Sequence, residues 1–456
     1  MHTRHMFFCT IIVVLLVSAC TGKPLVPNAQ TDISTPTKTT PTTQHSTKEV
    51  FVPPKILAAS LERLPLQIDE PVDITPLVIG NNQFALDLYQ RLRVENSQKN
   101  LVFSPYSIAM ALAMTYGGAR NETAAEMRSV LHIQQRDEAF HQSWNALDQL
   151  MLLRAEGPNE YEQGIRLRVT NAVWAQQDYP FLDEYLRLLA LNYGAGLHIT
   201  DFVNFPEESR QAINQWTYAE TEEKIKDLIP QGAIHQLTRM VLVNAIYLNA
   251  AWRQPFNEEH TQPGAFTLQD GSQIQVPLMW QIQNIPYSVN ENYSLVELPY
   301  STGKLGMLLI MPAEGQLETF SQALDVNRLE KIMADITWGD VDLALPRFQF
   351  RTGANLNDHL SQLGMKQAFI PAQADFSGME PGKELYIDQV IHQAFIDANE
   401  NGTEAAAATA VLMAGKGFNP AEPAEIHFNR PFLFIIRDIE TGAILFIGQV
   451  LNPAEQ

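Results

Sequence analysis

Residues Glu400–Ala414, with the sequence ENGTEAAAATAVLMA, form the most distinctive stretch of this chain and are followed by a Gly-Lys-Gly triplet. By propensity, four consecutive alanines beside a glutamate favour a helix. The context favours a strand, because Gly402 interrupts the start, β-branched residues follow the alanines, and β-rich stretches lie on both sides. The positions that would share one strand face, opposite Glu404, are Thr403, Ala405, Ala407, Thr409 and Val411. Because the segment is small on both faces, we expect it to insert into a sheet that is already packed.

The N-terminus has the layout of an export signal. Arg4 precedes an apolar run, Met6–Val17, and small residues then lead to Cys20. The run is shorter than the ~20 residues that a membrane-spanning helix needs. Small residues directly before a cysteine resemble the lipobox of bacterial lipoproteins, which implies a signal peptide over residues 1–19 and a lipid on Cys20. We therefore expect an exported lipoprotein, anchored on the extracellular or periplasmic face of a membrane. The alternative is an ordinary secretory signal with an incidental cysteine.

The composition argues against several kinds of partner and site. The chain has 456 residues, of which 45% are hydrophobic, enough for one large domain or two smaller ones. A net charge of −20 disfavours nucleic acid and anionic lipid surfaces as partners, so we expect membrane contact only through the lipid. The only cysteines, Cys9 and Cys20, lie in the signal region. The exported domain therefore has no disulfide and no cysteine-ligated metal.

Residues 20–75 are expected to be a flexible Thr/Pro-rich tether with a poorly defined lead-in, because they hold few large apolar side chains. The folded domain is expected over residues 76–456. Capping patterns predict helix starts at Asn81 or Asn82, at Ser104-Pro105, and at a capping box, Thr123–Glu126. The predicted strands are Leu167–Ala175, Met240–Leu248, Leu305–Met311 and Val341–Phe350, and further helices are predicted around residues 181–193, 206–228 and 355–364. This irregular order favours an α+β fold.

The chain lacks the motifs of common enzyme classes. It contains no Gly-x-Ser-x-Gly, no His-Glu-x-x-His and no GxxxxGK[ST] phosphate loop. Thr302-Gly303-Lys304 has the lysine of such a loop without its earlier glycine, and it predicts a hairpin turn instead. We therefore predict a protein that is not an enzyme and needs no cofactor or metal.

Several stretches, in this order, resemble the serpin family over residues 82–453. They are Leu101–Ala109 (LVFSPYSIA), Val243–Phe256 (VNAIYLNAAWRQPF), Leu345–Phe348 (LPRF), Leu385–Phe395 (LYIDQVIHQAF) and Asn429–Phe434 (NRPFLF). The most diagnostic part is the hinge, which comprises Glu400, Gly402, Thr403, Glu404, Ala405, Ala406, Ala407, Ala408 and Thr409. The resemblance implies a serpin fold with three β-sheets, about eight or nine helices and an exposed reactive-centre loop.

The resemblance also implies a monomeric suicide inhibitor of serine proteases. In inhibitory serpins the target protease cleaves the loop, the freed arm inserts into the large sheet, and the protease is trapped as a covalent acyl-enzyme. Insertion must outrun hydrolysis, which explains a hinge of small residues with Thr403 as the first to point inward. Bulky, charged or proline residues would be expected in a non-inhibitory member. The alternatives are a non-inhibitory serpin-fold binding protein or an inhibitor of cysteine proteases.

The reactive bond is placed by the family's spacing, fourteen residues after Gly402, at Lys416-Gly417. Fourteen residues at ~3.3 Å each span roughly 46 Å, about the length of a large sheet. A lysine suits the acidic specificity pocket of trypsin-like proteases. The segment that follows is longer than in familiar members, so Met413 or Phe418 is an alternative, with elastase-like or chymotrypsin-like targets.

Two further groups match structural switches of the family. The shutter, a hydrogen-bonded cluster beneath the large sheet, is matched by Ser104, Ser107, Asn244 and His392. The breach, where the loop first inserts, is matched by Trp252, Arg347 and Glu400. Within the breach we expect an ion pair between Arg347 and Glu400.

Overall fold

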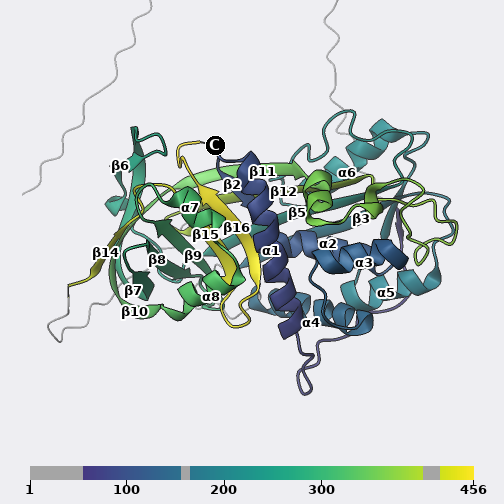
Figure 1. Ribbon diagram of the computed structural model, residues 1–456, viewed down its shortest axis with the longest axis horizontal. Helices are drawn as coiled ribbons and strands as arrows, with labels where there is room; N and C mark the ends of the chain where they lie inside the picture. The colour runs from purple at the N-terminus through teal and green to yellow at the C-terminus, as the bar shows by residue number, and fades with distance from the viewer. Residues whose placement is uncertain (1–54, 156–164, 404–421, 456) are drawn as a thin grey trace, which may run out of the picture. The chain divides into compact units, whose positions relative to one another are not determined.

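A seven-stranded sheet forms one half of the fold, and the region that precedes the hinge alanines lies within it. The structure is a computed structural model that describes residues 55–155, 165–403 and 422–455. The strand order is β1 (Lys55–Leu57), β4 (Leu197–Thr200), β3 (Arg166–Gln176), β5 (Met240–Ala251), β13 (Gly402–Thr403), β12 (Gln389–Asn399) and β11 (Phe348–Asn355). In Figure 1, β12, β5 and β3 can be followed side by side. The described residues form one compact unit.

A nine-stranded sheet forms the other half. Its order is β14 (Ala424–His427), β10 (Thr337–Pro346), β7 (Gln273–Val289), β8 (Tyr293–Pro299), β9 (Leu305–Pro312), β15 (Phe432–Asp438), β16 (Ile444–Val450) and β2 (Leu101–Phe103), with β6 (Gln262–Thr267) paired to β7. The family resemblance implied three sheets. The second and third are continuous here, because the long strand β7 pairs with β6 and β10 along most of its length and with β8 at its end.

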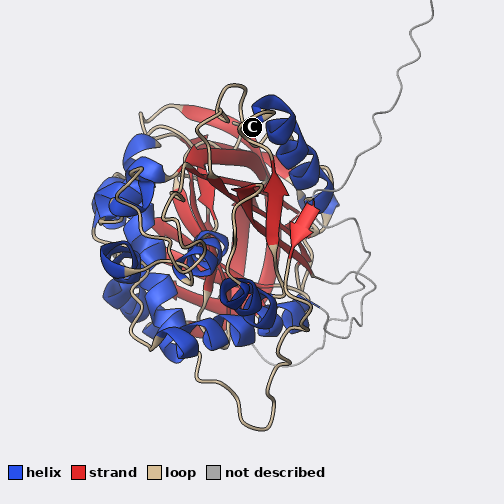
Figure 2. Ribbon diagram, turned by 90° about the vertical axis from the view of Figure 1, so that its right-hand side faces the viewer, coloured by secondary structure: helices blue, strands red, loops and turns tan. Residues whose placement is uncertain are grey.

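In Figure 2, helices lie to the left of the strands and below them, and helix is also seen at the upper right. They are α1 (Thr75–Glu95), α2 (Pro105–Tyr116), α3 (Asn121–Val130), α4 (Asp137–Ala155), α5 (Asp183–Tyr193), α6 (Pro206–Glu220), α7 (Leu317–Gln322), α8 (Val326–Ala334) and α9 (Asn357–Leu363), with short 3-10 turns at Glu258–His260 and Gln367–Phe369. Within the described ranges, no helix is both long and apolar enough to cross a membrane. The α+β prediction is confirmed.

Helix α2 connects the two sheets. All of its residues are buried, and it packs against β3 and β5 of the first sheet and β16 of the second. Ser104 caps it by accepting a hydrogen bond from Ser107 N, and Pro105 occupies the first turn. The start predicted at Ser104-Pro105 is therefore confirmed, and Gly117 is the C-cap of the helix. This buried helix places its N-terminus directly beneath the large sheet.

Two other predicted helix starts are wrong. Helix α1 begins at Thr75, so Asn81 and Asn82 lie inside it rather than capping it. Asn81 Nδ2 donates to Ile444 O at 3.2 Å and Asn82 Nδ2 to Gly442 O at 2.9 Å, so both side chains bind the β15–β16 hairpin instead. Helix α3 begins at Asn121, before the predicted capping box. Thr123 Oγ1 accepts from Asp375 N, and Glu126 accepts from two backbone amides of the 3-10 turn near residue 367.

The predicted strands are present, with one change of boundary. Val341–Phe350 is two strands, β10 and β11, because the chain changes sheets at Arg347. The hairpin turn predicted at Thr302-Gly303-Lys304 joins β8 to β9, and Gly303 has a φ of +67°. The lead-in is more ordered than its composition indicates. Strand β1 pairs with β4 at the sheet edge. Arg63 forms an ion pair with α4, because its Nη1 lies 2.8 Å from Asp148 Oδ2.

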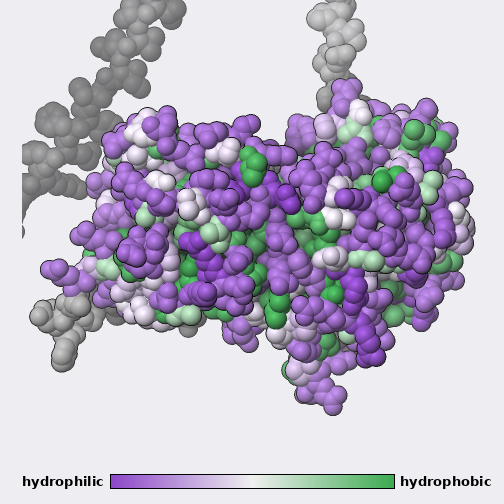
Figure 3. All heavy atoms as spheres, in the orientation of Figure 1, coloured by the Kyte–Doolittle hydropathy of each residue, from purple (hydrophilic) through white to green (hydrophobic). Residues whose placement is uncertain are grey.

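Figure 3 shows a face that is mainly hydrophilic, with hydrophobic side chains in scattered groups. Such a surface is expected for a chain of net charge −20.

Candidate functional site

The site is a fork in the large sheet between β5 and β12. Along Gln389–Ala394, β12 pairs directly with β5 in parallel register. Beyond this region the two strands diverge, and the two residues of β13 fill the opening between them. Thr403 pairs with Ala398 and Ala250, and Gly402 with Asn399 and Ala251, in both cases antiparallel. Any continuation of β13 as a central strand has to separate β5 from β12.

Gly402 is required by close backbone contact at the opening. Its φ is +151°, a region that side chains disfavour. A Cβ atom at this position would lie 2.1 Å from Ala250 O and 2.7 Å from Ala251 Cα. No flexible side chain could move aside, because both clashing atoms belong to the backbone. The glycine predicted as part of the hinge therefore has a steric reason to be there.

Thr403 points inward, as the strand pattern predicted. Its side chain is buried, and its Oγ1 lies 2.7 Å from Tyr300 Oη in hydrogen-bonding contact. Burial raises the pKa of Tyr300, so its phenol stays protonated and can donate. The sequence interpretation treated the whole hinge as a strand still outside its sheet. The structure differs in that Gly402 and Thr403 have already joined it, because their backbones pair on both sides.

Glu400 anchors the residues just before β13. Its side chain is almost fully buried, and Arg347 Nη2 lies 2.5 Å and Nε 2.7 Å from Glu400 Oε1. Thr261 Oγ1 donates to the same oxygen. The backbone carbonyl of Glu400 accepts from Phe256 N at 2.8 Å. The ion pair expected from the sequence is therefore present, within a set of satisfied hydrogen bonds.

Trp252 holds the turn between β12 and β13. Its indole Nε1 donates to Asn399 O and its backbone N to Asn401 O, both at 2.9 Å. The ring stacks on Tyr300 with centroids 4.8 Å apart and an interplanar angle of 10°. Trp252, Arg347 and Glu400 thus meet around the opening, as their predicted grouping required.

A buried polar cluster lies beneath the paired part of the fork, where His392 of β12 stands opposite Asn244 of β5. His392 Nε2 accepts from Ser104 N at 3.1 Å, and Ser107 N donates to Ser104 Oγ at 3.1 Å. Asn244 Nδ2 reaches Ser107 O at 3.5 Å. The structure therefore brings together all four residues predicted for the shutter, at the N-terminus of α2.

This cluster is incompletely satisfied. Among the residues that the structure describes, no partner is found for His392 Nδ1, Asn244 Oδ1 or Asn171 Nδ2, although all three are buried. A buried polar atom without a partner costs about 1–3 kcal/mol. Burial also lowers the pKa of His392 to about 3, so the ring is neutral at physiological pH. The paired state of β5 and β12 therefore carries a local free-energy penalty.

Three residues of the site were missed by the sequence analysis. Asn171 of β3 links the cluster, because its Oδ1 accepts from Ser107 Oγ at 2.6 Å and from Asn244 Nδ2 at 3.1 Å. Its signal was a lone amide in an apolar strand, the pattern that also marks His392. Tyr300 and Thr261 had no comparable signal in the sequence. Each belongs to the site only through a contact with a residue far along the chain, Thr403 and Glu400 respectively.

Other predicted residues lie outside the described ranges. They are the hinge residues Glu404, Ala405, Ala406, Ala407, Ala408 and Thr409, the reactive bond Lys416-Gly417 with its alternatives Met413 and Phe418, and the lipidation site Cys20. In the described part of the chain, no group of three or more His, Cys, Asp or Glu side chains is placed to hold a metal ion.

Comparison with known proteins identifies relatives along nearly the whole of the described chain. The family model described as "Serpin (serine protease inhibitor)" matches residues 79–453. An uncharacterized serpin-like protein of Thermococcus kodakarensis is 39% identical over 381 residues, covering 83% of this chain and 86% of the relative. Human leukocyte elastase inhibitor is 32% identical over 383 residues, covering 82% and 98%.

Solved structures agree with these relatives. The native state of tengpin, a thermophilic serpin, superposes with a TM-score of 0.76 at 27% identity, covering 88% of this chain and all of the other. Uncleaved ovalbumin superposes with a TM-score of 0.73 at 26% identity, covering 83% of this chain and all of the other.

Proposed function

Since the chain belongs to the serpin family, we propose that it is a suicide inhibitor of serine proteases that traps its target by loop cleavage and strand insertion. The observation that carries the proposal is the fork between β5 and β12, with Gly402 and Thr403 already paired to both strands. The first two residues of an inserting strand thus have backbone partners before any cleavage. Relatives that are named as inhibitors, such as leukocyte elastase inhibitor, support the same function.

The fork indicates how insertion proceeds. The target's serine attacks the carbonyl carbon of the reactive residue, forming an ester and releasing the amine of the next residue as a new N-terminus. The hinge is then free to extend β13 and to separate β5 from β12 along Gln389–Ala394. Each backbone group that loses its partner in that step gains one from the new strand. The alanines after Glu404 offer little steric resistance on either face.

The unpaired polar atoms of the shutter support a change from the intact form to the inserted form. Strand separation would expose His392 and Asn244 to the inserted backbone, and their free polar atoms would then have possible partners. These new partners would favour the inserted form over the intact form. This difference is what an inhibitor of this kind needs to move an attached protease.

The target class follows from the reactive residue. Lys416 fits trypsin-like proteases, and Met413 or Phe418 would fit elastase-like or chymotrypsin-like ones. We further propose that the protein is exported as a monomer and held on a membrane surface by a lipid on Cys20. Metabolic labelling with a fatty acid, compared between the natural chain and Cys20→Ala, tests the anchor. Label in both chains would reject it.

Incubation with trypsin, followed by denaturing electrophoresis, tests the inhibitory function. We expect a complex that survives SDS, and we expect Lys416→Ala to lose it. Mass mapping of the cleaved loop identifies the bond. Cleavage without any trapped complex, for trypsin, elastase and chymotrypsin alike, would instead indicate a non-inhibitory serpin-fold binding protein.

A further inference from the structure

The strands β14, β10 and β7 present one face to solvent beside the point where the reactive loop rejoins the fold (Figure 1). The register of the three strands and the alternation of their side chains place on this face Ile282, Asn284, Trp338, Asp340, Asp342 and Glu425. We propose that this outer face is a second docking surface for the target protease, and that it favours proteases with a basic surface beside the active site. The proposal rests on the inhibitory function proposed above and adds a further contact with the same partner.

The outer face is close to the reactive bond along the chain. Strand β14 begins at Ala424, eight positions after Lys416. A fully extended chain spans at most ~3.6 Å per residue, so the bond lies within about 29 Å of Ala424. A compact domain of ~200 residues is about 40 Å across. A protease that holds this bond is therefore wide enough to contact β14 and the strands beside it.

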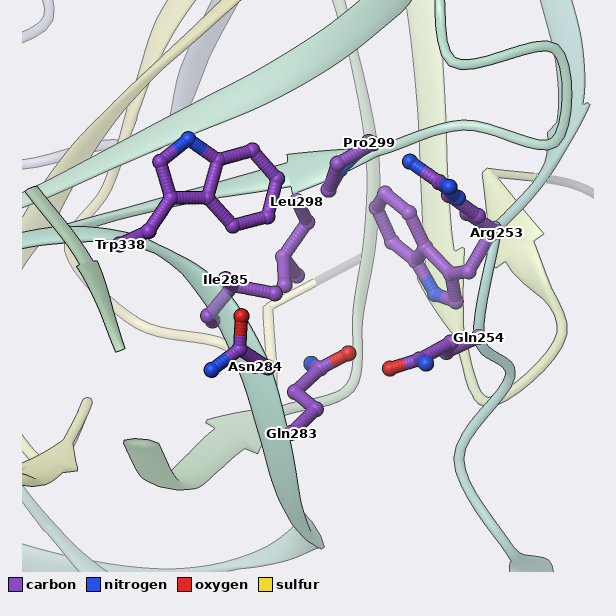
Figure 4. A pocket seen from close by; sticks show the side chains of 9 residues that line it. Arg253, Gln254, Gln283, Asn284, Ile285, Leu298, Pro299 and Trp338 are labelled. Atoms are coloured by element: carbon purple, nitrogen blue, oxygen red, sulfur yellow. The ribbon is translucent and has the colours of Figure 1, made fainter. Parts of the chain in front are cut away.

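Two large apolar side chains are exposed on the outer face. Trp338 is 63% exposed and Ile282 is 64% exposed. In Figure 4 the ring of Trp338 stands at one side of a pocket, and Arg253 lies at the opposite side. Tryptophan is enriched among the residues that dominate binding energy at protein interfaces, because it covers a large area with few rotatable bonds. The outer face therefore offers apolar anchors beside its charged side chains.

The charges on the outer face are negative. Asp342 of β10 and Glu425 of β14 occupy matched positions on neighbouring strands, where like charges repel. Asp340 Oδ1 accepts from Asn284 Nδ2 at 2.9 Å, and His427 Nε2 is 3.8 Å from Asp342 Oδ2. Within the described ranges, no lysine or arginine forms an ion pair with any of these three carboxylates. A basic partner would therefore meet uncompensated charge and relieve a repulsion.

The same charges disfavour other occupants. A second copy of this chain would bring an identical acidic face, and an anionic lipid surface would also be repelled. In the part of the chain that the structure describes, the acidic and histidine side chains do not form a group that could hold a metal ion. The position beside the reactive loop instead favours the protease as the partner.

Docking on the outer face would act on association. Carboxylates near the loop attract a basic protease and favour the orientation in which its active site meets the loop. In the proposed mechanism, insertion then carries the protease away from β14, so the outer face would not stabilise the final complex. We therefore expect the outer face to change the rate of trapping and to leave its stoichiometry unchanged.

Trapping rates with cationic and anionic trypsin, measured on the intact chain, test the proposal, because both enzymes cleave after lysine but differ in surface charge. The outer-face variant is Asp340→Asn/Asp342→Asn/Glu425→Gln, in which position 340 keeps an oxygen that can accept from Asn284. We expect it to trap cationic trypsin about tenfold more slowly than the natural chain at low salt, and to be nearly unchanged with anionic trypsin. The difference should shrink between ~0.01 M and ~1 M salt, because the screening length falls from ~30 Å to ~3 Å.

A matched control separates the outer face from net charge. Asp69→Asn/Glu70→Gln/Glu122→Gln has the same net charge as the outer-face variant, with its changes at exposed positions of the lead-in and α3. It should trap cationic trypsin within about twofold of the natural chain. Trp338→Ala should slow the trapping of cationic trypsin at both salt concentrations, because it removes contact area and no charge.

Cationic trypsin with its active-site serine replaced by alanine separates docking from trapping. In titration calorimetry we expect the outer-face variant to bind this inactive enzyme about tenfold more weakly than the control variant does. Equal rates and equal affinities in the two variants would overturn the docking proposal and leave the inhibitory function intact. Binding of the inactive enzyme through the outer face, without any trapping of active trypsin, would reject the inhibitory function instead. A dimer of the natural chain that dissociates in the outer-face variant, measured by analytical ultracentrifugation, would assign the face to a second copy and would also overturn the proposal.

Discussion

The two ends of the β5–β12 fork differ in how well their polar groups are satisfied. At the open end, Glu400, Trp252 and Thr403 all have hydrogen-bond partners, and the backbone of β13 is paired on both sides. At the closed end, three buried polar atoms around His392 have none among the described residues. The open end therefore holds the first two inserted residues firmly, while the closed end is the weaker junction. In the mechanism proposed above, insertion would therefore proceed from the well-satisfied end toward the less satisfied one.

The largest expected effect comes from blocking the open end. Thr403→Arg would force a long charged side chain into a buried site beside Tyr300. We expect the variant to be cleaved by trypsin without forming a trapped complex, a loss of roughly 100-fold or more in the fraction trapped, since burying an unpaired charge costs several kcal/mol. Thr403→Ser is the matched control, because it keeps the hydroxyl. If Thr403→Arg trapped trypsin as well as Thr403→Ser does, Thr403 would have no part in insertion.

A smaller effect is expected from loosening the open end. Glu400→Gln removes the charge that pairs with Arg347, whose side chain is 43% exposed and can partly return to water. Removing one partner of a buried pair costs about 3–5 kcal/mol, and this exposure reduces the expected loss to roughly 1–3 kcal/mol. We expect more heat-induced polymer on native gels. An unchanged amount of polymer would show that the ion pair does not hold this end closed.

The closed end should make the stability of the folded protein depend on pH. The pKa of His392 is lowered to about 3 by burial, whereas in the unfolded chain it is about 6.5. The unfolded state therefore binds the proton first, and native stability falls as pH drops from 6.5 toward 3, by about 1.4 kcal/mol per pH unit for this group. Denaturant melts at several pH values should show a weaker acid dependence in His392→Gln. The same slope in both proteins would remove His392 as the cause.

The smallest effect concerns the hydrogen bond of Trp252. Trp252→Phe keeps an aromatic ring for stacking on Tyr300 and loses the bond from Nε1 to Asn399 O. We expect a loss of about 1 kcal/mol in unfolding free energy, measured by denaturant melts. A loss of several kcal/mol would mean that the packing of the ring, rather than this bond, dominates at the open end.

The sequence predicted the parts of the fold that depend on local patterns. The cap at Ser104, the four predicted strand segments and the glycine at position 402 were readable, because each is set by neighbouring residues. The helix start predicted at Asn81 or Asn82 was wrong, because the partners of both side chains lie in the C-terminal hairpin, about 360 positions away. Polar side chains of this kind can cap a helix or bind a distant carbonyl with equal chemistry.

The sequence predicted which residues lie at the candidate site better than it predicted how they are arranged. The residues that the resemblance assigned to the shutter and to the breach lie together in the structure, including the Arg347–Glu400 pair. The depth of β13 in the sheet was not predictable, because it depends on how far β5 and β12 diverge. Tyr300 was missed for a similar reason, since only this partial insertion places Thr403 beside its hydroxyl.

Thermal unfolding of the intact and loop-cleaved chains tests strand insertion most directly. If β13 extends between β5 and β12 after cleavage, the cleaved form gains a full central strand, and its unfolding temperature should rise by well over ~10 °C, equivalent to several kcal/mol. Thr403→Arg should show little of this rise. An unchanged or lower unfolding temperature in the cleaved natural chain would contradict insertion.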